Sequence, residues 1–131
     1  MLITGLYAAL LALLALWLAA RVVWRRNKAR VGIGNGGDQD LAMRRRAHGN
    51  LLEYAPLALI LLLLLELDHM TVWVLHLLGI VLVVARLLHA WGLSHSAGTS
   101  FGRFAGTVLT WLVMLTMIAL LLWQQALAWM T

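Results

Sequence analysis

The sequence predicts an all-α integral membrane protein, built as a bundle of four transmembrane helices. Two observations predict this fold class: 63% of the 131 residues are hydrophobic, and the apolar residues gather in four long runs without the alternation of barrel strands. A soluble domain of this length could not bury so much apolar surface, because a small globule keeps much of its chain at the surface. Unpaired backbone groups are costly in lipid, so the runs are expected to be helices.

Each run is long enough for a membrane span, which needs about 20 apolar residues. The expected helices cover residues 2–24, 41–67, 72–92 and 104–130, and together they form a single membrane domain over residues 1–131. The first run is not expected to be a cleaved signal peptide, since no basic residue precedes it and the charge follows it.

The positive charge of the chain is distributed unevenly along the sequence. All ten Lys and Arg residues lie in or near the first and third connections: Arg21, Arg25, Arg26, Lys28, Arg30, Arg44, Arg45, Arg46, Arg86 and Arg103. The second connection carries Glu66 and Asp68 and no Lys or Arg. The positive-inside rule therefore predicts that both termini face outward and that the first and third connections face the cytoplasm. The net charge of +5 is assigned to topology and anionic lipid headgroups, and no nucleic-acid partner is expected.

The connections show no recognisable phosphate or metal site. Residues 32–37 are rich in glycine, but no Gly-Lys-Ser/Thr follows them, so they are interpreted as a turn in which Asp38 or Asp40 caps the second helix. The chain has no cysteine, which excludes disulfides and thiolate ligands. No metal site is expected, on His95 or elsewhere, because the histidines lack paired ligand spacing.

A polar stripe is the strongest functional signal. Arg46, Asn50 and Glu53 fall within a narrow arc at about 100° per residue, and Tyr54 lies at its margin. Pro56 follows and can kink the helix. Ionisable groups at membrane depth usually have a function, and a carboxylate there needs a cation or a proton. By charge, the stripe suits a zwitterionic ligand with more than one carboxylate, such as glutathione.

A second pair of polar residues lies on the third span. Arg86 and His89 share one face, at positions i and i+3. Arg86 could extend to the interface, pair with Glu53, or form a structural ion pair that locks helices together.

Residues 46–56 read Arg-Ala-His-Gly-Asn-Leu-Leu-Glu-Tyr-Ala-Pro, which resembles the signature R-A-x-x-N-x-x-E-[YN]-x-P of the MAPEG family. These are the membrane-associated proteins in eicosanoid and glutathione metabolism, and they include leukotriene C4 synthase and the microsomal glutathione transferases. Ala85-Arg86-Leu87 also matches a family pattern, and Arg30-Val31 before a glycine-rich turn resembles an uncharacterised bacterial branch. The resemblance implies a left-handed bundle in the bacterial inner membrane. It also implies a homotrimer with glutathione sites between subunits that open to the cytoplasm.

The resemblance also implies roles for individual residues. The implied glutathione-binding positions are Arg26, Arg46, His48, Asn50, Glu53, Tyr54, Arg86 and His89. His89 and Leu93 stand where well-studied members have tyrosines, and His48 replaces a frequent glutamine. Arg103 is the candidate catalytic residue, because active members use an arginine before the fourth helix to stabilise the glutathione thiolate.

Three functions remain open at this stage. The first is a glutathione transferase or peroxidase, whose thiolate attacks a lipophilic electrophile or peroxide from the lipid side. The second is a binding or scaffold protein with the same fold and no chemistry. The third, a small transporter, is ranked last because no polar face continues across the outer half of the helices.

Overall fold

The structure is a computed structural model that describes residues 2–95 and 100–130, and the side chains of all these residues except 94 and 95. The side chain of His95, on which no metal site was expected, thus lies outside the described residues. Within the described ranges the chain forms four helices: α1 (Ile3–Ala29), α2 (Gln39–Leu67), α3 (Val72–His95) and α4 (Phe101–Met130). Each helix is long and apolar enough to cross a membrane. The predicted fold class, a four-helix membrane protein, is therefore confirmed.

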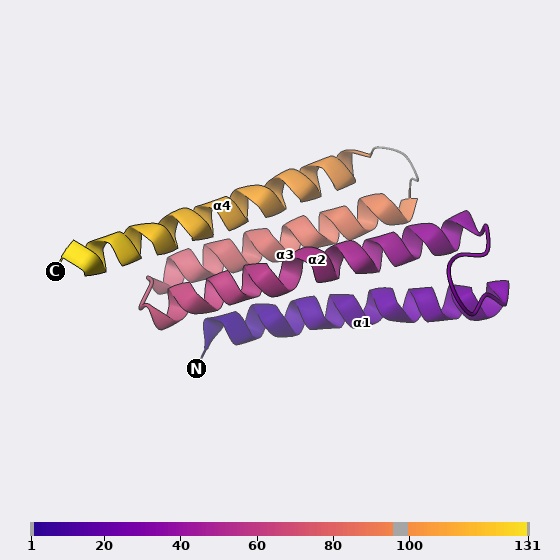
Figure 1. The fold of residues 1–131 in the computed structure, drawn as a ribbon, viewed down its shortest axis with the longest axis horizontal. Coiled ribbons are helices and arrows are strands. Elements are labelled where there is room, and N and C mark those ends of the chain that lie inside the picture. The colour runs from indigo at the N-terminus through magenta and orange to yellow at the C-terminus, as the bar shows by residue number, and fades with distance from the viewer. Residues whose placement is uncertain (1, 96–99, 131) are drawn as a thin grey trace.

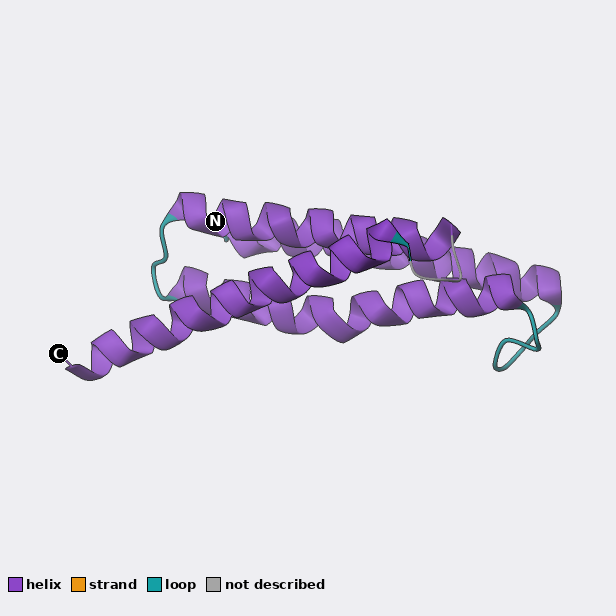
Figure 2. Cartoon of the chain, turned by 90° about the horizontal axis from the view of Figure 1, so that it is seen from above, coloured by secondary structure: helices purple, strands orange, loops and turns teal. Residues whose placement is uncertain are grey.

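The four helices run alternately up and down (Figure 1). The α1–α2 connection, the end of α3 and the start of α4 lie at one end of the bundle, called the basic end below, and the α2–α3 connection, the start of α1 and the end of α4 lie at the opposite end (Figure 1). Figure 2 shows α4 crossing the other helices at an angle, so that its C-terminal end extends beyond them. All four helices are longer than the sequence predicted: α1 continues to Ala29, α2 begins at Gln39, α3 continues to His95 and α4 begins at Phe101.

The apolar core lies around α3, which contacts each of the other three helices. Leu11, Leu62, Leu82 and Met117, one from each helix, are almost completely buried in this core. Many other large apolar side chains point outward, as expected where the surrounding solvent is lipid.

Two glycines bring α4 close to α3. A Cβ at Gly106 would lie 2.6 Å from the backbone nitrogen of His89 and 2.7 Å from the carbonyl oxygen of Ala85. A Cβ at Gly102 would lie 2.9 Å from the carbonyl oxygen of Leu88. Gly102 and Gly106 therefore form a small-xxx-small contact, in which small residues four positions apart let two helix backbones approach closely.

The connection between α1 and α2 is held by charged side chains. The Asp38 carboxylate caps α2 by accepting a hydrogen bond from the Leu41 backbone N–H at 2.9 Å. Arg25 donates to Asp38 at 2.7 Å and lies 3.1 Å from Asp40. The Leu41 N–H, and next the Arg25 guanidinium, hold the pKa of Asp38 below its usual value. Of the two aspartates expected as caps, Asp38 has this role.

The opposite end of the bundle is closed by Glu66. Its carboxylate accepts hydrogen bonds from the backbone N–H groups of Ile3 and Thr4, the latter at 2.8 Å. A carboxylate at a helix N-terminus satisfies amides that have no partner within the helix. This acidic residue of the second connection therefore ties α2 to the start of α1. The helix α2 itself remains continuous through Pro56.

Candidate functional site

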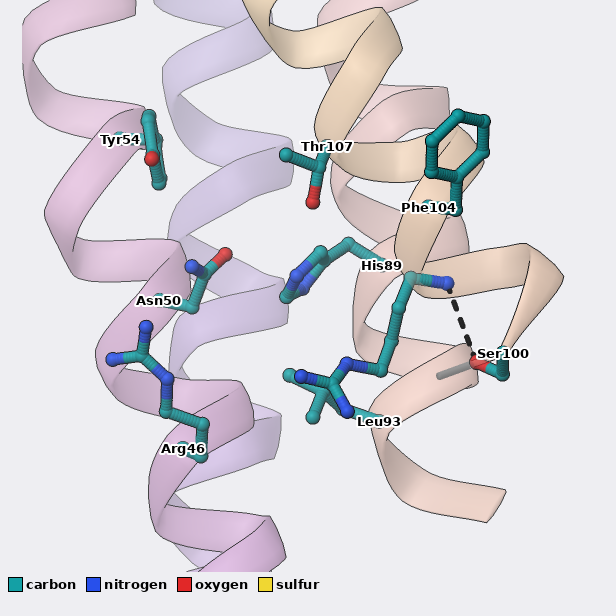
Figure 3. Close-up of a pocket in the computed structure, with 9 residues that line it drawn as sticks. Arg46, Asn50, Tyr54, His89, Leu93, Ser100, Phe104 and Thr107 are labelled. Atoms are coloured by element: carbon teal, nitrogen blue, oxygen red, sulfur yellow. Dashed lines mark hydrogen bonds between the residues drawn. The ribbon is translucent and has the colours of Figure 1, made fainter. Parts of the chain in front are cut away.

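A cavity of about 370 Å³ opens at the basic end of the bundle, between α2, α3 and α4. Figure 3 shows the side chains that line it. These residues are Arg46, Asn50, Tyr54, His89, Leu93, Ser100, Arg103, Phe104 and Thr107. The volume falls within the range of about 300–1,000 Å³ that is typical of small-ligand sites.

The α2 wall of the cavity consists of Arg46, Asn50 and Tyr54. These residues are spaced by four, so they lie on one face of the helix. Glu53, the fourth member of the predicted stripe, does not line the cavity. Its carboxylate accepts a hydrogen bond from Arg46 at 2.9 Å, on the outside of α2, where both side chains are at least half exposed.

Arg86 lies behind the α2 wall and is only 1% exposed. Its guanidinium donates to the Asn50 amide oxygen at 2.5 Å and to the Thr110 hydroxyl at 3.3 Å, and it lies 5.7 Å from the Tyr54 ring centroid. Arg86 therefore neither extends to the interface nor pairs with Glu53, so two of the readings left open for it are wrong. The third reading holds in part: Arg86 joins helices, but through hydrogen bonds to the neutral groups of Asn50 and Thr110 and not through an ion pair. The physical reason is that Glu53 points to the outer face of α2, whereas Asn50 points inward.

The α3 wall consists of His89 and Leu93. His89 is 5% exposed, and its Nδ1 atom has no hydrogen-bond partner among the described residues. In Figure 3 the imidazole points toward the space between Asn50 and Thr107. This ring is therefore placed to contact a ligand in the cavity.

The α4 wall begins at the helix N-terminus. The Ser100 hydroxyl accepts a hydrogen bond from the Arg103 backbone N–H at 3.4 Å and donates to the Gly92 carbonyl oxygen at 3.2 Å (Figure 3 marks the first). Arg103 lies in the first turn, where a cation is electrostatically unfavourable, and this turn contains no acidic residue. Arg46, Arg103 and the α4 N-terminus together make the cavity favourable for an anion.

Besides Glu53 and Arg86, two further expected site residues do not line the cavity. Arg26 donates to three carbonyl oxygens of the α1–α2 connection, the shortest being Gly32 at 2.8 Å. It borders a separate hollow of about 270 Å³ together with Asn27 and Arg30. His48 lies partly exposed on α2 and does not line the cavity.

Several residues of the α4 wall were not predicted from the sequence. Ser100, Phe104 and Thr107 line the cavity, and Thr110 anchors Arg86 behind it. Ser100 lies three residues before Arg103 and Thr107 lies four residues after it, so both share its helix face. This spacing was the signal in the sequence that could have identified them. Among the described side chains, those of residues 2–93 and 100–130, no group of three His, Asp or Glu residues could hold a metal ion.

Comparisons with known proteins agree with this architecture. The family model described as "MAPEG family" matches residues 4–123, which include every residue of the cavity. The inner membrane protein YecN of Escherichia coli strain K12 is 38% identical over 121 residues, which cover 92% of this chain and 91% of the relative. YecN of Escherichia coli O6:H1 is similar to the same extent. This chain is an integral, multi-pass membrane protein that belongs to the MAPEG family.

Proposed function

We propose that the cavity binds glutathione and stabilises its thiolate for attack on lipophilic electrophiles. The observation that carries this proposal is the meeting of Arg46, from α2, and Arg103, from α4, on one cavity at the basic end. Glutathione has two carboxylates, one ammonium group and one thiol. It therefore needs more than one cation, and a cavity with two arginines on opposite walls meets that need.

Recognition of the peptide is assigned to the α2 side. The Arg46 guanidinium pairs with a ligand carboxylate, since its planar fork fits two carboxylate oxygens. The Glu53 carboxylate lies outside the cavity and pairs with the Arg46 guanidinium, so we assign it to holding Arg46 in place rather than to contact with the ligand. The Asn50 side chain lines the cavity, and its amide nitrogen lies 3.5 Å from Glu53. This nitrogen carries two N–H donors, so it can also donate a hydrogen bond to a ligand carbonyl.

Activation of the thiol is assigned to Arg103. Its guanidinium shares the cavity with the apolar side chains of Leu93 and Phe104, and a charge interaction is stronger in such a low-dielectric site. Each unit by which the thiol pKa falls represents about 1.4 kcal/mol. The thiol proton leaves to water, and the thiolate sulfur forms a bond to an electrophilic carbon whose leaving group takes the displaced electron pair. With a peroxide, the thiolate sulfur would instead attack one oxygen while the O–O bond breaks, and the other oxygen would leave with the electron pair and take up a proton. A second glutathione would then displace water from the oxidised sulfur to give the disulfide.

The assembly we propose is a homotrimer, with sites between adjacent subunits that open to the cytoplasm. The exposed ion pair of Arg46 and Glu53 supports this arrangement, since these side chains are 58% and 50% exposed on a membrane-spanning helix. Exposed charges in lipid are costly, and a second copy would cover them. The concentration of Lys and Arg at the cavity end supports the cytoplasmic orientation.

Calorimetric titration of the purified protein with glutathione tests the binding step. We expect Arg46→Ala to weaken binding by about tenfold or more, because a charge-assisted hydrogen bond contributes about 1.5–3 kcal/mol. Arg45→Ala is the matched control, since Arg45 is the preceding arginine, is exposed and does not line the cavity. Equal losses in the two variants, or no binding by the unaltered protein, would contradict the proposal.

A non-catalytic glutathione-binding protein is the alternative. The α3 wall favours it, because Leu93 is apolar and His89 is the only polar side chain among the described ones that α3 contributes to the cavity lining. This alternative predicts glutathione binding without thiolate formation.

A further inference from the structure

A second hollow lies outside the candidate site, on the face where α1 and α3 meet. It is an apolar groove of about 470 Å³. It is lined by Leu10, Leu13, Leu14, Trp17, Val83 and Leu87. Several of these side chains are about half exposed, including Leu13, Trp17 and Leu87. The groove therefore opens to the surroundings of the bundle, which at this depth are hydrocarbon.

The groove ends in positive charge on the side of the basic end. The Arg21 guanidinium carbon lies 4.8 Å from the ring centroid of Trp17, the last groove residue of α1. Arg44 donates to the Arg21 carbonyl oxygen at 3.5 Å. From Leu10 to Arg21 the helix rises about 16 Å, at about 1.5 Å per residue. An apolar channel of this length below a guanidinium matches the shape of a single acyl chain below its headgroup.

The charges around Arg21 favour an anionic headgroup. Its neighbourhood contains the guanidinium groups of Arg21, Arg25 and Arg44 and the carboxylates of Asp38 and Asp40. The cluster therefore carries a net charge of +1. A phosphate at this level would balance that charge and lie beside a tryptophan, a residue type that prefers the membrane interface.

A second copy of the chain is a poorer match for this position. The sequence has five acidic residues, and the partner or the position of each is known from the structure. Asp38 and Asp40 belong to the cluster itself, Glu53 pairs with Arg46, Glu66 caps α1, and Asp68 lies at the opposite end of the bundle. A neighbouring copy thus offers no further carboxylate at the level of Arg21.

We propose that the α1–α3 groove is a binding site for an anionic phospholipid, with one acyl chain along Leu10, Leu14 and Trp17 and the phosphate at Arg21. This site is separate from the cavity between α2, α3 and α4. It would fix the depth and rotation of α1 in the membrane whether or not the cavity binds glutathione.

Tryptophan quenching tests the proposal with defined lipids. The full chain is reconstituted in phosphatidylcholine vesicles that contain increasing fractions of bromine-labelled phosphatidylglycerol or bromine-labelled phosphatidylcholine. The contribution of Trp17 is obtained by subtracting the signal of Trp17→Phe. We expect the labelled phosphatidylglycerol to quench Trp17 with about fivefold higher relative affinity, corresponding to about 1 kcal/mol for one basic side chain near the surface. Arg21→Gln should reduce the ratio of the two lipid affinities to about one. Arg45 is an exposed arginine of the same end, and Arg45→Gln should leave this ratio unchanged.

Three results would overturn the site. Equal quenching of the unaltered protein by the two labelled lipids would show that the headgroup is not recognised. Failure of both lipids to quench Trp17 would show that a second copy of the chain covers the groove. Retention of the preference in Arg21→Gln would remove the guanidinium from the site. The first two comparisons use the unaltered chain beside Trp17→Phe, so they do not depend on the folding of the arginine variants.

Discussion

At the residue scale, the central group is the Arg86 guanidinium. It is 1% exposed in a helix that crosses the membrane, and it donates to Asn50 on α2 and to Thr110 on α4. A buried guanidinium is costly unless its hydrogen-bonding groups are satisfied. Arg86 therefore connects three helices directly behind the cavity, and it holds the Asn50 amide so that its nitrogen faces Glu53.

Removal of the Asn50 oxygen should destabilise the bundle. We expect Asn50→Ala to lower the free energy of unfolding by about 2–3 kcal/mol, because the hydrogen bond to a charged group is lost and part of the buried charge is left unsatisfied. Asn50→Asp retains an acceptor for Arg86 and should lose much less. Thermal unfolding of the three proteins in one detergent measures the difference. Equal melting temperatures for the two variants would show that Arg86 does not depend on this oxygen.

At the element scale, the close approach of α4 to α3 sets the width of the cavity. Gly106 faces the backbone of His89, and Gly102 faces the carbonyl oxygen of Leu88. The cavity-lining residues Arg103 and Thr107 are adjacent to these glycines on α4. Any side chain at Gly106 would therefore push the α4 wall away from the α3 wall.

Gly106→Ala should destabilise the chain by about 1–3 kcal/mol, the usual cost of overpacking, because the new Cβ would lie 2.6 Å from backbone that cannot move aside. Gly49→Ala is the matched control in α2, where nothing lies within 4 Å of an added Cβ. Its helix-propensity gain of about 1 kcal/mol should leave the protein as stable or more stable. Denaturation in detergent compares the two variants, and similar losses in both would contradict the close packing of α3 and α4.

The N-terminus of α2 should make stability depend on pH. Hydrogen bonding to Leu41 and Arg25 lowers the pKa of Asp38 in the folded state. The contribution of the ionised carboxylate is therefore fully present above its unfolded pKa of about 3.9, and it is lost as the pH falls through the lower folded pKa. Melting temperatures below about pH 4 should fall less steeply for Asp38→Asn than for the unaltered protein. Parallel slopes would show that this carboxylate is not stabilised by folding.

At the scale of the whole molecule, the distribution of charge predicts the orientation in the membrane. The chain has no cysteine, so single cysteines can be introduced without a background signal. We expect Thr71→Cys, at the opposite end, to react with a membrane-impermeant maleimide on intact spheroplasts. Ile33→Cys, which is 94% exposed in the α1–α2 connection, should react only after the membrane is opened. The reverse pattern would contradict the positive-inside prediction.

The fold was largely predictable from the sequence because lipid imposes long apolar runs on each spanning helix. The helix ends were not. The α1 helix continues through Arg25 and Lys28 to Ala29, since a helix does not end where the hydrocarbon does. Hydropathy indicates which part of a helix lies in lipid. The end of the helix depends instead on capping, here by Arg30 in the left-handed conformation.

The candidate site was predictable where it depends on one helix. The helical period placed Arg46, Asn50 and Glu53 within one arc, with Tyr54 at its margin. The structure brings Arg46, Asn50 and Tyr54 to one wall of the cavity, whereas Glu53 lies on the outer face of α2. Contacts between helices could not be read from one sequence, because they depend on how each helix is rotated. For this reason the partner of Arg86 proved to be Asn50 and not Glu53.

Thiol activation by the cavity can be tested directly by the ultraviolet difference absorbance of the purified protein when glutathione is added, recorded in the thiolate band. We predict a saturable thiolate signal in the unaltered protein. The signal should disappear in Arg103→Gln, while calorimetry still detects bound glutathione, because Arg103 stabilises the sulfur and Arg46 holds the peptide. Binding without a thiolate signal in the unaltered protein, or an undiminished signal in Arg103→Gln, would contradict thiol activation by this cavity.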